Sequence, residues 1–340
     1  MPKAGSPPSP TRDLWYSVLP VLPLILATLI ASILIDPDKE LSFLHIAKGE
    51  YLSEPQIAYR HLGDMLTYIA LATIHCVLCI GVVVYFVRMM QELSVEQRRH
   101  ARVFFSGTGV LIIGLILYLT VNADRDVLVQ LGYKATCQVL QTADLPTKLV
   151  KACFTPGSVT ISKLTLLAWI PTFIGMATIV FAGAFTYGNA SALPDPDEPS
   201  WRDVVEQRTK ALQKSVYALS AVLVSSTITI TLFAHLPIGL FEDKSDLAKA
   251  LSHYAGGLST FWGALFSLTL VATFAPPTLL LLRRAYEQDA STGPVEDLRS
   301  WLHEHVFVSL RKQFVNAASL LAPLLVGPLS SLFSSLASAS

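Results

Sequence analysis

The chain has 340 residues, of which 52% are hydrophobic and only 15% are charged, and its formal net charge is zero. Soluble domains carry about 25% charged residues, so this composition argues against a soluble protein. The absence of a net positive charge also argues against a nucleic-acid partner. Residues 1–13 are rich in Pro and Ser, and we expect them to form a disordered N-terminus.

Six charge-free stretches follow in chain order, each close to the roughly 20 apolar residues that a helix needs to cross a bilayer. They occupy residues 14–35, 65–87, 103–123, 164–185, 215–241 and 258–282. The first is too long for the core of a signal peptide and lacks a small-residue cleavage pattern, so we interpret it as an uncleaved span. The sequence therefore predicts an all-α integral membrane protein whose six-helix bundle fills residues 14–285.

The distribution of Lys and Arg predicts the orientation, because these residues favour the cytoplasmic side of a membrane. With the N-terminus inside, the cytoplasmic segments hold 15 basic residues and the outer loops hold 10. We therefore expect both termini in the cytoplasm and the protein in the cell (inner or plasma) membrane.

Two cysteines, Cys137 and Cys153, share a loop that this topology places outside the cell. A disulfide between them would close a loop of about 15 residues and contribute on the order of 3 kcal/mol. Two unpaired thiols are the alternative.

The cytoplasmic segments have features of a helical layer. Ser94 followed by Gln97 resembles a capping box at the start of the third helix. A helical pattern begins at Trp201, so the fifth helix should project about two turns before its apolar stretch begins.

For residues 286–340 the sequence predicts an amphipathic cytoplasmic helix followed by a hydrophobic C-terminal helix. No charged residue occurs after Lys312. Three interpretations of this tail stay open. It can lie on the membrane or dock on the bundle, it can enter the membrane as a short seventh span, or it can mediate self-association through its small residues.

The sequence offers few groups for catalysis. Cys76 and Cys79 lie one helical turn apart beside His75, but no second pair completes a metal site, and buried free cysteines commonly act as small apolar residues. His303 and His305 point to different sides of a helix. Nucleotide-binding and hydrolase motifs are absent from the sequence. We expect neither enzyme activity nor a metal ion or cofactor.

No Asp, Glu, Lys or Arg interrupts the six stretches, which argues against an ion-coupled transporter. The polar side chains that remain carry hydroxyl groups. A hydroxyl stripe can line a wet pore, or it can bond to its own helix or to a neighbouring one. The pore-lining candidates are Ser220, Thr227, Thr231, Ser267 and Thr273, and the candidates for a gate hinge are Pro276 and Pro277.

The leading hypothesis is an oligomeric membrane channel, lined by the fifth and sixth spans and gated through its cytoplasmic helices. Its partners would be the lipid bilayer, further copies of the chain, and a cytoplasmic protein or small-molecule trigger. A bacterial stress or defence effector fits this plan by analogy of class. The alternatives are a non-conducting anchor or sensor subunit of a larger complex, and a facilitative transporter of an uncharged solute.

Overall fold

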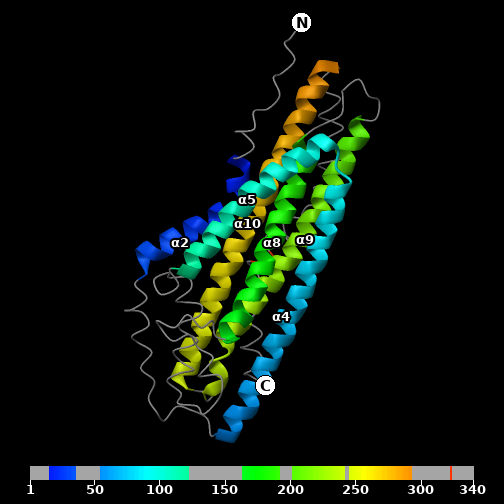
Figure 1. Cartoon of the computed structure of the whole chain (residues 1–340). Helices are drawn as coiled ribbons and strands as arrows, with labels where there is room; N and C mark the ends of the chain where they lie inside the picture. The colour runs from blue at the N-terminus through cyan, green and yellow to red at the C-terminus, as the bar shows by residue number, and fades with distance from the viewer. Residues whose placement is uncertain are drawn as a thin grey trace.

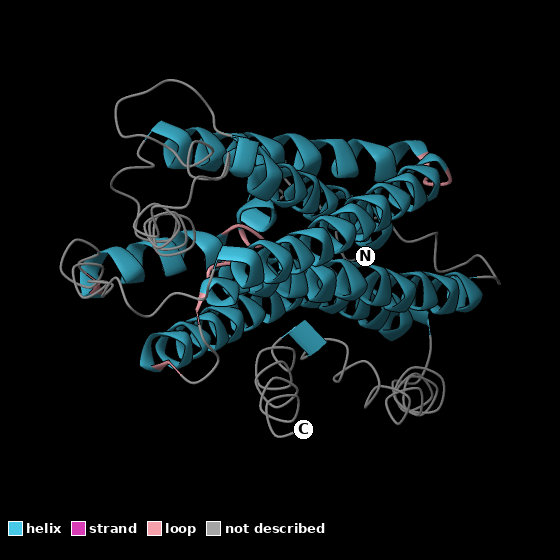
Figure 2. Ribbon diagram, turned by 90° about the horizontal axis from the view of Figure 1, so that it is seen from below, coloured by secondary structure: helices cyan, strands magenta, loops and turns pink. Residues whose placement is uncertain are grey.

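The computed structural model describes residues 15–35, 54–121, 163–191, 201–241, 245–292 and 322–323. Within these ranges the chain is helical, with short connecting loops and no strand (Figure 2). The α-helices are α2 (Leu22–Leu34), α4 (Glu54–Gln91), α5 (Val95–Val121), α8 (Lys163–Ser191), α9 (Trp201–His235) and α10 (Asp246–Thr292), and a short 3-10 helix, η4 (Ile238–Leu240), lies between α9 and α10.

Five helices contain segments that are long and apolar enough to cross a membrane. These segments are Gly63–Gln91, Val95–Tyr118, Trp169–Ser191, Asp203–Leu240 and Asp246–Ala285. The molecule is therefore all-helical in the part described, and its helices fit the multi-pass membrane protein that the sequence predicts.

The first apolar stretch differs from the prediction of an unbroken helix over residues 14–35. Residues 15–18 are helical, residues 19–21 form a turn, and α2 begins only at Leu22. Pro20 and Pro23 explain the break, because proline has no N–H to donate and is tolerated only in the first turn of a helix. The 13 residues of α2 extend over about 20 Å, which is less than the roughly 30 Å of a hydrocarbon core.

The other helices agree more closely with the sequence. α9 begins at Trp201, well before its charge-free stretch, and α10 extends beyond residues 258–282 at both ends. The capping box at the start of α5 is confirmed, since the Ser94 backbone N–H donates to Gln97 Oε1 at 2.9 Å and the Gln97 N–H donates to Ser94 Oγ at 3.3 Å.

α8 is the central helix and packs against α4, α5, α9 and α10 (Figure 1). Two glycines let α5 approach it closely. A Cβ atom on Gly183 would lie 2.5 Å from the Phe104 ring, and one on Gly188 would lie 2.8 Å from the Ala101 Cβ. Small residues of this kind allow membrane helices to pack at short distance, and here they join α5 to the bundle.

Successive long helices alternate in direction, so their ends form two groups (Figure 1). One group contains the C-terminal ends of α4, α8 and α10 and the N-terminal ends of α5 and α9. The basic residues near these ends are Arg88, Arg98, Arg99, Arg102, Arg208, Lys210, Lys214, Arg283 and Arg284. This grouping agrees with the predicted alternation of the loops. It stays a prediction that this end faces the cytoplasm. The forms predicted for residues 1–13 and 286–340 stay predictions too, because of these residues only 286–292, which continue α10, and 322–323 are described.

Candidate functional site

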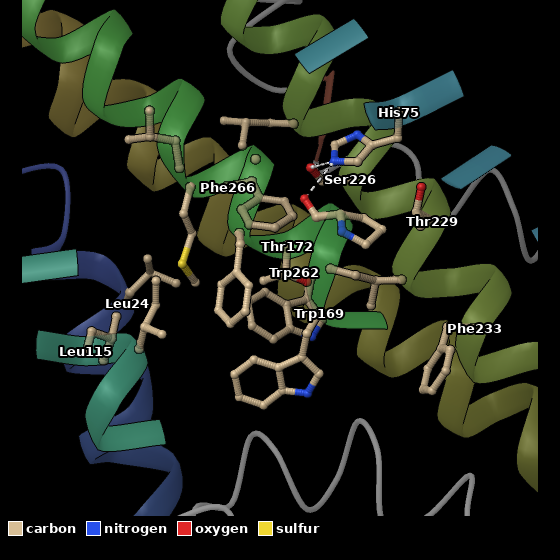
Figure 3. A pocket seen from close by; sticks show the side chains of 18 of the residues that line it. Leu24, His75, Leu115, Trp169, Thr172, Ser226, Thr229, Phe233, Trp262 and Phe266 are labelled. Atoms are coloured by element: carbon tan, nitrogen blue, oxygen red, sulfur yellow. Dashed lines mark hydrogen bonds between the residues drawn. The ribbon is translucent and has the colours of Figure 1, made fainter. Parts of the chain in front are cut away.

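A cavity of about 190 Å³ lies inside the bundle, between side chains of α2, α4, α5, α8, α9 and α10 (Figure 3). Its wall is rich in aromatic rings, which belong to Tyr68, Trp169, Phe173, Phe233, Trp262 and Phe266. None of its described lining residues is Asp, Glu, Lys or Arg. The cavity is therefore an apolar space in the membrane region of the fold.

The cavity reaches the surface of the chain beside the first turns of α8. There the lining residue Thr172 is exposed and Trp169 is half-buried. Leu115 and Ile116 of α5 and Thr28 of α2 are also half-buried members of the wall.

α8 makes room for the polar end of the cavity through Pro171 and Gly175. Proline inside a helix removes one backbone N–H and its ring displaces the preceding turn. One turn later, a Cβ atom on Gly175 would lie 3.6 Å from both His75 Nε2 and Ser226 Oγ. A side chain larger than alanine at this position would therefore compete with these two groups for space.

His75 is the centre of that polar end, and its ring is 1% exposed. Its Nδ1 lies 2.6 Å from Ser225 Oγ of α9. Its Nε2 lies 3.3 Å from the Pro171 carbonyl oxygen of α8 and 3.5 Å from Ser226 Oγ of α9. Three helices thus meet at one imidazole, and Figure 3 shows the ring beside Ser226 at one end of the cavity.

Cys79 lies one turn after His75 on α4, and its Sγ is 3.4 Å from His75 Nε2. Cys79 is buried and Cys76 is half-buried, and both are free thiols. Among the described residues, no group of three His, Cys, Asp or Glu side chains is placed to hold a metal ion. His303 and His305 lie outside the described residues.

The five predicted pore-lining residues are all buried within the single chain, and none of them lines the cavity: Ser220, Thr227, Thr231, Ser267 and Thr273. The threonines bond to their own helices. Thr227 Oγ1 donates to the Leu223 carbonyl at 2.9 Å, and Thr273 Oγ1 donates to the Thr269 carbonyl at 2.7 Å.

One hydroxyl of this set also joins two helices. Thr231 Oγ1 lies 2.7 Å from the Thr227 carbonyl of its own helix and 2.7 Å from Ser259 Oγ of α10. Hydroxyl groups in membrane helices commonly have these two uses. A role for the set in lining a pore stays a prediction.

The roles of the remaining predicted residues are not tested by the structure. Pro276 and Pro277 lie inside α10, which continues from Asp246 to Thr292. Their use as a gate hinge stays a prediction. Cys137 and Cys153 lie outside the described residues, so their disulfide also stays a prediction.

Sequence reasoning named His75 only as a neighbour of Cys76 and Cys79, and it did not predict that Ser225, Ser226 and Pro171 surround the ring. A signal was present in the fourth span, where Pro171 and Gly175 are one turn apart in an otherwise apolar stretch. In such a pair the proline removes a backbone hydrogen bond of the helix, and the glycine allows a neighbouring helix to approach closely. The identity of that neighbour is not encoded locally.

Fold and cavity together define the class as a multi-pass helical membrane protein with an internal apolar cavity. No protein-family model matches the chain, and neither a curated protein nor a solved structure is significantly similar to it.

Proposed function

We propose that the chain is a membrane-embedded sensor subunit that binds an uncharged, largely apolar small molecule inside its helix bundle. The observation that carries this proposal is the cavity itself, whose wall is mostly aromatic and aliphatic and holds the buried His75 among its few polar residues. Concave apolar sites with a few convergent polar groups are the usual form of small-molecule sites.

The lining argues for an uncharged ligand. An ion in an apolar site loses its hydration, at a cost of several kcal/mol unless a countercharge is present. The described wall offers none. The size of the cavity argues for a compact ligand, because a cavity of about 150 Å³ engineered in another protein binds benzene.

Binding of toluene to the purified chain in nanodiscs tests the proposal. Toluene at about 100 times its Kd should stabilise the protein by about 2.7 kcal/mol and raise Tm by a few degrees. Leu115→Trp, which fills the cavity edge, should abolish the rise. Leu117→Trp is the matched control, since Leu117 lies on the same helix, is 59% exposed and is not part of the wall. A Tm unchanged by toluene in the wild type would contradict the proposal.

We also keep the oligomeric channel as a second proposal. It is favoured by Ser267, whose buried hydroxyl oxygen has no hydrogen-bond partner among the described residues. A pore between copies of the chain could supply water to such a group after a small rotation of α10. Assembly as a homo-oligomer, gating through the cytoplasmic helices and a role in stress or defence belong to this proposal.

Recordings in planar bilayers test the channel. Conductance that changes when Thr227 or Thr231 is replaced by a bulky residue would support it, and the absence of current with or without cell extract would contradict it. Mass photometry in nanodiscs measures the oligomeric state directly, and a monomer would remove the basis of the pore.

A further inference from the structure

We propose that the outward face of α5 binds one anionic phospholipid, whose phosphate lies on Arg99 and Arg102 and whose acyl chain lies along the apolar residues that follow. This site is separate from the cavity and does not depend on a ligand inside the bundle. Three features of α5 carry the proposal: two arginines without partners, a continuous exposed face, and the length of the apolar part of that face.

Three arginines lie within the first eight residues of α5, and the fold uses only one of them. The Arg98 guanidinium donates to the carbonyl oxygens of Gln91 at 3.0 Å and Leu93 at 2.8 Å, so it caps the end of α4. Arg99 and Arg102 are exposed. In the part of the chain that the structure describes, neither of them has a hydrogen bond or an ion pair.

The local structure gives no reason for these two charges. The positive end of a helix dipole is at its N-terminus, so cations near the start of α5 do not stabilise the helix. The acidic residue of the first turn, Glu96, is exposed and forms no ion pair with a described side chain. The two guanidinium groups are therefore available to an anion from outside the chain.

The same face of α5 continues as an exposed apolar surface. Residues at steps of three and four lie on one side of a helix. The exposed residues that follow these steps are Arg99, Arg102, Ser106, Val110, Ile113 and Leu117. α5 packs on α8 with its opposite side and has little contact with α4, so described helices leave this face uncovered on the outside of the bundle (Figure 1).

The chemistry of this face fits a phospholipid. Arginine binds phosphate oxygens with two parallel hydrogen bonds. Residues 106–117 extend over about 16 Å along the helix, close to the roughly 15 Å of one leaflet of a hydrocarbon core. Basic residues beside membrane helices attract anionic lipid headgroups. A soluble phosphate or a nucleic acid would contact the arginines alone and leave the apolar part unused.

Native mass spectrometry of the purified full chain tests the proposal, with phosphatidylglycerol and phosphatidylcholine of the same acyl chains as probes. Each arginine beside an anionic lipid should strengthen its binding about fivefold. Arg99→Gln combined with Arg102→Gln should therefore lower the preference for phosphatidylglycerol about 30-fold. A wild-type chain that retains both lipids equally would overturn the proposal.

A second pair of substitutions controls for total charge. Lys210→Gln combined with Lys214→Gln removes the same charge from exposed positions of α9 at the same end of the bundle. This pair should change the preference by less than twofold. Equal losses in both double variants would overturn the site on α5, because bulk charge would then explain the binding.

Glycerol 3-phosphate separates a lipid site from a site for a free anion. It carries the phosphate without an acyl chain, so at equal concentration it should leave the bound phosphatidylglycerol in place. Displacement of the lipid at that concentration would overturn the role of the apolar face.

Photo-crosslinking of the wild-type chain locates the lipid and requires no variant. The probe is phosphatidylglycerol with a diazirine in its acyl chain, mixed into phosphatidylcholine nanodiscs. We expect enriched labelling within residues 106–117 relative to the same diazirine chain on phosphatidylcholine. Labelling of other helices alone, as expected if a second copy of the chain covered this face, would overturn the proposal.

Discussion

The helices α8, α9 and α10 differ from α4 and α5 in how much of their apolar surface the chain itself covers. In the most apolar window of each helix, 56% of the positions in α8 and 44% of those in α9 and in α10 are buried. The corresponding shares are 28% in α4 and 22% in α5. All five windows are apolar enough to cross a membrane, so composition does not explain the difference.

Position in the bundle explains it instead. α8 lies between α4, α5, α9 and α10, whereas α4 and α5 both pack on α8 and have little contact with each other. Their outer side chains, such as Val77 and Val110, stay exposed and suit a lipid environment. The cavity lies where the covered helices meet the outward-facing ones.

The largest expected change in stability distinguishes a buried position from an exposed position on the same helix, α10. Leu270 of α10 is fully buried, whereas Leu268 on the same helix is 58% exposed. Leu270→Ala should lower the free energy of unfolding by about 2–5 kcal/mol, because a buried leucine leaves a cavity behind. Leu268→Ala should change it by under about 0.5 kcal/mol. Denaturation of both variants in the same lipid mixture measures the difference, and similar losses would break the comparison.

A smaller effect is expected where α5 joins the covered helices. Gly183→Ala forces the Phe104 ring to move, and overpacking of this kind costs about 1–3 kcal/mol. Gly114→Ala on α5 is the control, since a Cβ atom there meets nothing within 4 Å. That change should raise stability by roughly 0.5–1 kcal/mol, because alanine loses less backbone entropy in a helix.

Thermal unfolding in one detergent shows whether each glycine variant is more or less stable than the wild type. Opposite changes in Tm for the two variants would support the contrast between the face of α5 that packs on α8 and the face that points outward. A stabilising Gly183→Ala would show that the close approach of α5 to α8 is absent.

The smallest effect concerns the hydroxyls between α9 and α10. Thr231→Val removes the contact with Ser259 Oγ, and hydrogen bonds between membrane helices contribute about 0.6 kcal/mol on average. Thr227→Val removes a bond within α9 alone and should cost less. A double-mutant cycle that combines Thr231→Val with Ser259→Ala measures the coupling energy between these two side chains, and hence between α9 and α10. A coupling energy of zero would mean that this pair does not hold the two helices together.

The sequence allowed much of the fold to be predicted, because its signals are local. Five long helices, the capping box of Ser94 and Gln97, and the early start of α9 all follow from spacing along one segment. The break before α2 was missed although its cause, Pro20 and Pro23, is also local. The prediction of one unbroken helix there relied on the length of the apolar stretch and gave too little weight to the two prolines.

The sequence by itself therefore determined the all-helical class and the five helices that are long and apolar enough to cross a membrane, since hydropathy and capping act over a few turns of one helix. Only the tertiary structure decided which polar groups meet. Hydropathy does not encode the rotation of a helix about its axis, and rotation placed the predicted hydroxyls of α9 and α10 in buried positions off the cavity wall. The same rotations brought His75, Pro171 and Ser226 from three helices to one end of an aromatic cavity.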